Sequence, residues 1–214
     1  MTQEKMTIHK ALSELKILDK RIYNKIIDFT PCVANKNTNA VVHGKPIDDF
    51  KITEKEKYVS IKDLTSRRNA MKKAVVLSNA KTIVTVAGIE MTVAEAIEMK
   101  IGGIELTRNL YNNMKKNYAS AKVECERYNR DLAERADKYV EGTFGSADKK
   151  SSKDLEEMEK VRKQFIENNT YKVVACVDVE KEISELEQFL DRFDAEVDAA
   201  LSVSNAITEI EIEY

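Results

Sequence analysis

Apolar residues recur every three to four positions along most of this chain, which is the period of an amphipathic helix. Such stripes predict helices over about 7–29, 53–78, 93–140, 153–168 and from 178 onward. The pattern therefore predicts a mainly α fold. We expect long antiparallel helical hairpins that form a single helical domain over 1–214.

One short pattern occurs twice, each time at the end of a helical stripe. Ser78-Asn79-Ala80-Lys81-Thr82 and Ser204-Asn205-Ala206-Ile207-Thr208 both lead into alternating β-branched residues. Asn tolerates the left-handed conformation that ends a helix, and the alternation is typical of a strand. We therefore expect two helix-to-strand junctions, whose strands pair as neighbours in one small sheet.

The strands after these junctions predict a small antiparallel β-sheet. It combines a hairpin near 82–91 with a C-terminal strand over 208–213. Thr92 and Glu95 have the spacing of a capping box, so the third helix is expected to begin there. Gly102-Gly103 lies inside that helix and predicts a kink or a close backbone approach, because glycine weakens a helix.

Two stretches lack helical periodicity. The first, 30–49, holds both prolines and is expected to be an irregular arm, which either folds on its own subunit or swaps to a neighbour. The second, 141–152, is polar and rich in Gly and Ser, and it predicts a flexible connection between two helices.

Composition narrows the classes of protein. Charged residues make up 34% of the 214 residues and aromatic residues 7%, a mixture typical of long helices with solvated faces. The net charge of -2 disfavours a nucleic-acid polymer as partner, and Tyr111 and Tyr118 are expected to pack rather than to stack on bases. The sequence lacks both the ~20-residue apolar run of a membrane span and a signal-peptide pattern. We therefore expect a cytoplasmic protein without a membrane partner.

Candidate catalytic and metal-binding residues are few. Cys32, Cys125 and Cys176 lack metal-ligand spacing and are expected to be small buried hydrophobes. His9 and His43 have no carboxylate or cysteine at ligand spacing, and no glycine-rich phosphate loop follows a strand. The sequence therefore predicts a protein that is not an enzyme and that has no metal site and no cofactor.

Charged residues interrupt three apolar stripes, at Asp19, Arg68 and Arg108. An isolated buried charge costs on the order of 5 kcal/mol, so each must be paired or reach solvent. One interpretation is an internal ion pair of Asp19 with Arg68 or Arg108, which fixes the helix register. The other is that the arginines line a pocket for an anion, because their forked donors suit phosphate and carboxylate.

The densest basic patch lies at 66–73. It is interpreted either as a solvated helix face or as a surface that contacts the phosphate of a nucleotide-like ligand or an acidic partner. In the second interpretation the two junctions help to shape the site. The candidate ligand-binding residues are then Arg67, Arg68, Asn69, Lys72, Lys73, Asn79, Thr82, Arg108, Asn205 and Thr208.

Ser78-Asn79, Thr82, Gly88 and the helix start Thr92-Val93-Ala94-Glu95-Ala96 follow one another in an order that a known group of proteins shares. The chain resembles a group of small, uncharacterised helical proteins of bacteria and their phages, some of them labelled septicolysin-like. Asn205 and Thr208 are similar to that family's C-terminal ending. The family's Arg and first Asn fall on Ala74 and Val76 here. The resemblance implies a fold and a bacterial or phage origin, without a settled activity.

Two classes of function remain open. The first is a non-enzymatic, oligomeric, phage-related protein of the host cytosol that binds or sequesters a small phosphorylated, nucleotide-like ligand. The alternative is a structural or assembly protein of a phage virion or a bacterial complex. Both imply a homo-oligomer, because the long third helix needs a partner for its apolar seam. A direct pair of Arg68 with Asp19 in a dry seam favours assembly, and convergence of Arg68 and Arg108 on a pocket favours binding.

Overall fold

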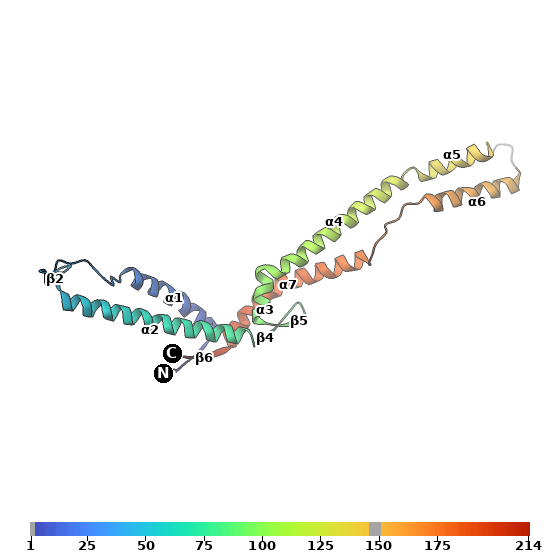
Figure 1. The fold of residues 1–214 in the computed structure, drawn as a ribbon. Coiled ribbons are helices and arrows are strands. Elements are labelled where there is room, and N and C mark those ends of the chain that lie inside the picture. The colour runs from blue at the N-terminus through green and yellow to red at the C-terminus, as the bar shows by residue number, and fades with distance from the viewer. Residues whose placement is uncertain (1–2, 146–150) are drawn as a thin grey trace. The chain divides into compact units, whose positions relative to one another are not determined.

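The computed structural model describes residues 3–145 and 151–214, and the fold is mainly α, as the hydrophobic pattern predicts (Figure 1). The helices are α1 (Ile8–Ile27), α2 (Ile47–Asn79), α3 (Val93–Glu98), α4 (Ile104–Asn129), α5 (Leu132–Phe144), α6 (Ser152–Asn169) and α7 (Val179–Ile207). A π-helical turn, η1 (Met99–Gly103), joins α3 to α4. The strands are β1 (Gln3–Thr7), β2 (Val41–Val42), β3 (Lys45–Pro46), β4 (Ile83–Val86), β5 (Ile89–Thr92) and β6 (Glu209–Glu213). Within these residues, no helix is both long and apolar enough to cross a bilayer.

The chain folds into two compact units. Unit 1 comprises Met1–Gly103 and Asp191–Tyr214, and unit 2 comprises Ile104–Leu190. Helix α7 contributes residues to both units. The single helical domain over 1–214 therefore stays a prediction, and each unit is described by itself.

Unit 1 contains a helical hairpin of α1 and α2 with a two-stranded sheet, β1 and β6, packed against it (Figure 1). The hydroxyl of Thr7 caps α1 by accepting a hydrogen bond from the N–H of Lys10. From there, apolar residues at three- and four-residue spacing turn toward α2. Each large side chain among them contributes about 1.5–3 kcal/mol on burial. The core of this hairpin and its sheet is a cluster of Met6, Ile8, Ala11, Leu15, Leu18, Met71, Val75, Ile210 and Ile212.

The arm between α1 and α2 is shorter than the sequence predicts. We expected irregular chain over 30–49 and a helix from about 53, but α2 begins at Ile47. The fixed φ of Pro46, -52° here, suits the entry into a helix, and acidic residues occupy the first turn. The arm also contains a short strand, β2, which pairs with β3.

The strands that follow the two Ser-Asn junctions lie in different sheets, so the expectation that they pair with each other is wrong. β4 pairs with β5 through the predicted turn at Ala87-Gly88, where both residues have positive φ. β6 pairs instead with β1, with Glu209 opposite Thr7. Alternation of apolar and polar residues fixes which face of a strand is buried, but it does not choose the strand's partner.

The third predicted helix is interrupted twice, by η1 and by a break between α4 and α5. Gly102-Gly103 lies in η1, so the predicted irregularity is confirmed. A Cβ at Gly103 would lie 3.0 Å from a carboxylate oxygen of Glu98. The flexible connection expected over 141–152 is too long, because α5 continues to Phe144; 146–150 lie outside the described residues.

The cysteines differ from expectation. Cys32 and Cys176 are exposed, and Cys125 is half-buried. The prediction that all three are buried hydrophobes is therefore wrong. Cys32 and Cys176 lie in irregular segments between helices, and such segments run over the surface rather than through the core.

Candidate functional site

Arg67 is held by carboxylates of its own chain. Its guanidinium donates hydrogen bonds to Glu4 and Glu14, both at 2.9 Å, and lies 5.5 Å from the ring centre of Tyr214. The Tyr214 hydroxyl donates to Glu4. This Arg67 network therefore joins α1, α2, β1 and the last residue of the chain.

The members of the Arg67 network shift one another's pKa. Hydrogen bonds from Tyr214 and then from Arg67 lower the pKa of Glu4 below its usual value. The bond to Glu4 raises the pKa of Arg67 and also that of Tyr214. Arg67 Nε is buried and has no partner within the described residues, so solvent does not reach this donor. An anionic ligand would have to compete with two carboxylates for the remaining donors.

Arg68 makes the internal ion pair that the interrupted stripe predicts. Its Nε lies 2.9 Å from a carboxylate oxygen of Asp19 on α1. The side chains are 33% and 55% exposed, so this pair is wet rather than sealed in a dry seam. Arg108 belongs to unit 2 and lies 3.6 Å from Glu105, one turn earlier on its own helix. Arg68 therefore pairs with Asp19, which was one of the two interpretations.

Asn69 and Lys73 line an open groove of 680 Å³ between α2 and β6. Glu211 and Glu213 form its acidic wall, which opposes the entry of an anion. Lys72 is exposed and, like the two arginines, is absent from the described residues that line this groove. The basic patch therefore does not converge on one cavity. The other lining residues are Ser66, Ala70, Ala74 and Leu77.

The two junctions have the same backbone hydrogen bonds. The Thr82 N–H donates to the carbonyl of Ser78, and the Thr208 N–H donates to that of Ser204, both at 2.9 Å. No asparagine among the described residues has positive φ, so the left-handed helix ends expected from these residues are wrong. A turn of helix-like hydrogen bonding leads into each strand instead. The junction candidates are all half-buried: Asn79, Thr82, Asn205 and Thr208.

Each junction also docks the start of another helix. The Thr82 carbonyl accepts from the N–H of Val93, and the Thr208 carbonyl accepts from the N–H of Ile8, both at 2.9 Å. These are the first residues of α3 and α1. Each follows a capping threonine with nearly identical φ and ψ, -70° and 155° at Thr92 and -71° and 155° at Thr7.

This correspondence reveals an internal repeat that the sequence analysis missed. Met6-Thr7-Ile8-His9-Lys10-Ala11 has its counterpart in Met91-Thr92-Val93-Ala94-Glu95-Ala96. The Met, Ile or Val, and Ala of both copies are buried. One repeat runs from β1 through α1 and α2 to β4. The other begins with β5 and α3 and ends with α7 and β6, with η1, α4, α5 and α6 between α3 and α7. Each of these sheets pairs the first strand of one repeat with the last strand of the other.

Unit 2 carries two identical polar clamps, one heptad apart. Tyr118 and Lys122 of α4 both bind Glu180 of α7, at 2.5 and 2.7 Å. Seven residues earlier on α4, Tyr111 donates to Glu187, and Lys115 contacts the same carboxylate at 3.4 Å. Both tyrosine hydroxyls lie at the surface, where each donates a hydrogen bond to a glutamate. Their glutamate partners were missed, because helix pairing cannot be read from a local pattern. The partners fix the antiparallel register of α4 and α7. The tyrosine, lysine and glutamate residues are Tyr111, Lys115, Tyr118, Lys122, Glu180 and Glu187.

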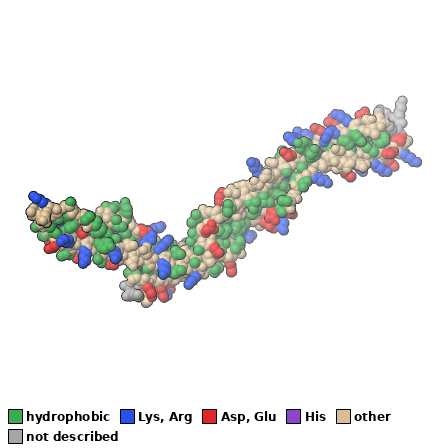
Figure 2. Space-filling model, in the orientation of Figure 1, with side chains coloured by type: hydrophobic (Ala, Val, Ile, Leu, Met, Phe, Trp, Pro, Cys, Tyr) green, Lys and Arg blue, Asp and Glu red, His purple; other side chains and the backbone are tan. Residues whose placement is uncertain are grey.

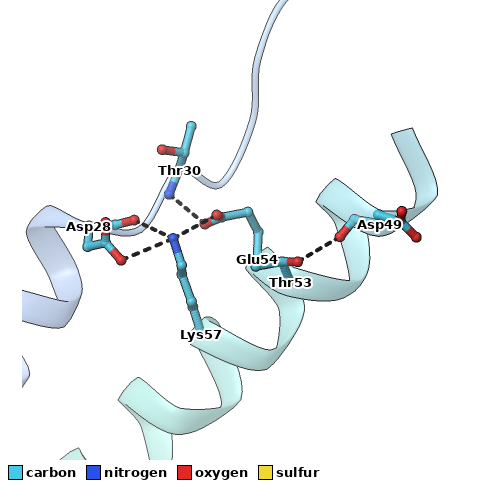
Figure 3. Close-up of polar contacts among 6 residues, drawn as sticks. All are labelled: Asp28, Thr30, Asp49, Thr53, Glu54 and Lys57. Carbon is cyan, nitrogen blue, oxygen red and sulfur yellow. Dashed lines mark hydrogen bonds and ion pairs between the residues drawn. The ribbon is translucent and has the colours of Figure 1, made fainter. Parts of the chain in front are cut away.

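In unit 1, a further polar cluster fixes the end of the α1–α2 hairpin that carries the arm (Figure 3). Lys57 lies between Asp28 and Glu54, at 3.1 and 2.9 Å, and the Thr30 N–H donates to Glu54 at 2.8 Å. The bond from Thr30 and then that from Lys57 lower the pKa of Glu54. Every charge in the cluster has a partner, so it anchors the arm rather than offering open ligand positions.

The described ranges contain no group of three or more His, Cys, Asp or Glu side chains that could hold a metal ion. No protein-family model, no curated protein and no solved structure matches this chain. The resemblance to septicolysin-like proteins therefore stays a prediction.

Proposed function

We propose that this chain is a non-enzymatic structural protein of the bacterial or phage-infected cytosol that assembles with copies of itself. The observation that carries the proposal is the thin core of unit 2. α4 buries Ile104 and α6 buries no residue within the described residues; the other buried residues of unit 2 are Leu132, Ala136 and Val140 of α5 and Leu190 of α7. A pair of packed helices cannot enclose an apolar core by itself. The exposed apolar surface of unit 2 therefore needs a further layer of protein to cover it.

Large apolar side chains stay in contact with solvent in both units (Figure 2). On α4, Leu106 is 76% exposed and Val123 is 63% exposed. On α2, Ile52 and Leu77 are 57% and 50% exposed. Exposed apolar surface of this extent is typical of proteins that associate.

Charge supports assembly over ligand capture. Arg67 and Arg68, the strongest candidate anion donors, already bind carboxylates at 2.9 Å. Breaking such partly buried pairs to admit a phosphate would leave Glu4, Glu14 or Asp19 uncompensated. Binding of a small phosphorylated ligand remains a second candidate, and the observation in its favour is the groove at Asn69 and Lys73.

Sedimentation velocity over a hundredfold range of protein concentration tests the proposal. We expect a discrete homo-oligomer at micromolar concentration that dissociates on dilution. A monomer over the whole range would refute self-assembly. Titration with ATP, followed by calorimetry, tests the second candidate: binding that Lys73→Ala abolishes would favour it, and absence of heat would exclude ATP.

A further inference from the structure

One face of α2 forms a continuous, self-complementary stripe. Two grooves follow this face in succession, and most of it lies away from the core residues Met71 and Val75, although Ala70 also packs against that core. Its positions alternate in steps of four and three, the spacing of a coiled-coil seam. From one end to the other the stripe contains Ile52, Glu56, Val59, Asp63, Ser66, Ala70, Lys73 and Leu77.

The charges of this α2 stripe lack ion-pair partners within the described residues, as does Lys72 on another face of the helix. Within the described residues Glu56, Asp63 and Lys73 form no ion pair, whereas Lys57, Arg67 and Arg68 are paired. The apolar ends of the stripe are open as well, because Ile52 and Leu77 are half or more exposed.

We propose that the α2 stripe is a dimer interface, on which the α2 stripe of a second copy of this chain lies antiparallel about a two-fold axis. This rests on the proposed self-assembly and names the surface that performs it. An antiparallel pair places each residue opposite one fixed residue of the other copy. An axis that crosses α2 between Leu64 and Thr65 puts Ile52 opposite Leu77, Glu56 opposite Lys73, Val59 opposite Ala70, and Asp63 opposite Ser66.

That register matches three of its four layers by chemical type, and Asp63 faces Ser66 in the fourth. Apolar residues face each other at both ends, an acid faces a base in the next layer, and Val59 fits over the small Ala70. Because the axis is two-fold, the Glu56–Lys73 pair occurs twice. Lys55 of the second copy would also lie opposite Ala74, beside the acidic wall of Glu211 and Glu213. The stripe spans 25 residue steps, or about 38 Å of helix.

The register predicts a rescue that a contact within one chain cannot produce. Glu56 and Lys73 are 17 residues apart on one helix, about 26 Å, so they cannot pair within a chain. Glu56→Lys places lysine against lysine twice in the dimer, and Lys73→Glu places glutamate against glutamate twice. The double variant restores both pairs with the charges exchanged. A heterodimer of the two single variants also restores both pairs, one with the charges exchanged and one with the original charges.

The experiment is sedimentation equilibrium on the full-length wild type and these variants at low salt. We expect each single charge reversal to raise the dimer dissociation constant about tenfold or more. The double variant and the equimolar mixture should return it to within about threefold of wild type. Lys72→Glu is the matched control: it changes the same charge on the neighbouring residue, which projects about 100° away from Lys73, and should leave association unchanged.

The results of this experiment distinguish failure of the α2 interface from failure of self-assembly. An oligomer that ignores both charge reversals, or reversals that the double variant does not rescue, would overturn this interface and leave self-assembly standing. A wild-type monomer would overturn both. Far-UV circular dichroism of each variant should match wild type, because these side chains are exposed and make no contact that the fold requires.

Discussion

Replacing Arg67 by methionine should destabilise unit 1 far more than the same change at the next residue. Methionine keeps a long side chain but removes the cation between Glu4 and Glu14. Those three side chains are 25–29% exposed, so the remaining carboxylates are screened only in part. Arg68 and Asp19, at 33% and 55%, are closer to water.

The size of the effect follows from burial. Removing one partner of a fully buried ion pair costs about 3–5 kcal/mol, and an exposed pair contributes about 0.2–1 kcal/mol. Because the Arg67 network is partly buried, its loss should lower the free energy of unfolding by about 2 kcal/mol. Loss of the more exposed Arg68 pair should lower it by about 0.5 kcal/mol. In a chain of this length, 2 kcal/mol lowers the melting temperature by about 4–8 °C.

The assay is thermal unfolding followed by far-UV circular dichroism, for Arg67→Met and Arg68→Met at neutral pH. The pH dependence adds a second test. Tyr214 and Arg67 lower the folded pKa of Glu4, so their stabilisation is present above the usual carboxylate pKa and is lost as the pH falls through the folded pKa. The difference between Arg67→Met and wild type should therefore shrink in acid. Equal losses at both arginines, or a difference that grows in acid, would refute this reasoning.

Three other predictions follow from the described contacts. Thr7→Ala and Thr92→Ala should each cost about 1 kcal/mol in chemical denaturation, because each hydroxyl accepts a hydrogen bond from the N–H of the third helical residue, although only Thr92 also belongs to a capping box; a large loss at one with none at the other would contradict the repeat. Glu180→Gln should speed hydrogen exchange around Tyr118 and Lys122, and the difference should vanish in acid, because Lys122 and Tyr118 lower the folded pKa of Glu180. Tyr214→Phe should raise the pKa of Glu4, as carboxyl titration by NMR would show; an unchanged pKa would exclude that hydrogen bond.

Local features of the fold were predictable because local chemistry causes them. The Thr92–Glu95 capping box and the Ala87-Gly88 turn each rest on a few adjacent residues. The strand partners were not predictable, since the alternation in β6 suits any neighbour. The clue was nonetheless present: Met6-Thr7 and Met91-Thr92 mark equivalent helix starts, and each pairs with the junction of the other repeat.

The candidate site likewise contains contacts that the sequence predicts and contacts that it does not. The interrupted stripes identified Arg68 and Asp19 as an ion pair, because a charge on an apolar face needs a partner. Arg67 was placed with the basic patch, although the structure surrounds it with Glu4 and Glu14. Those carboxylates lie more than 50 positions away in the chain. The patch is therefore basic in the sequence, but in the fold acidic residues from distant positions lie beside it.

Native mass spectrometry of the full-length protein, purified from its host, tests the central claim most directly, because one spectrum reports both the number of subunits and any retained small molecule. The account predicts a homo-oligomer whose mass is a whole multiple of 24.4 kDa, with no additional ligand mass. A monomer, or an assembly that retains a molecule of nucleotide size, would contradict it.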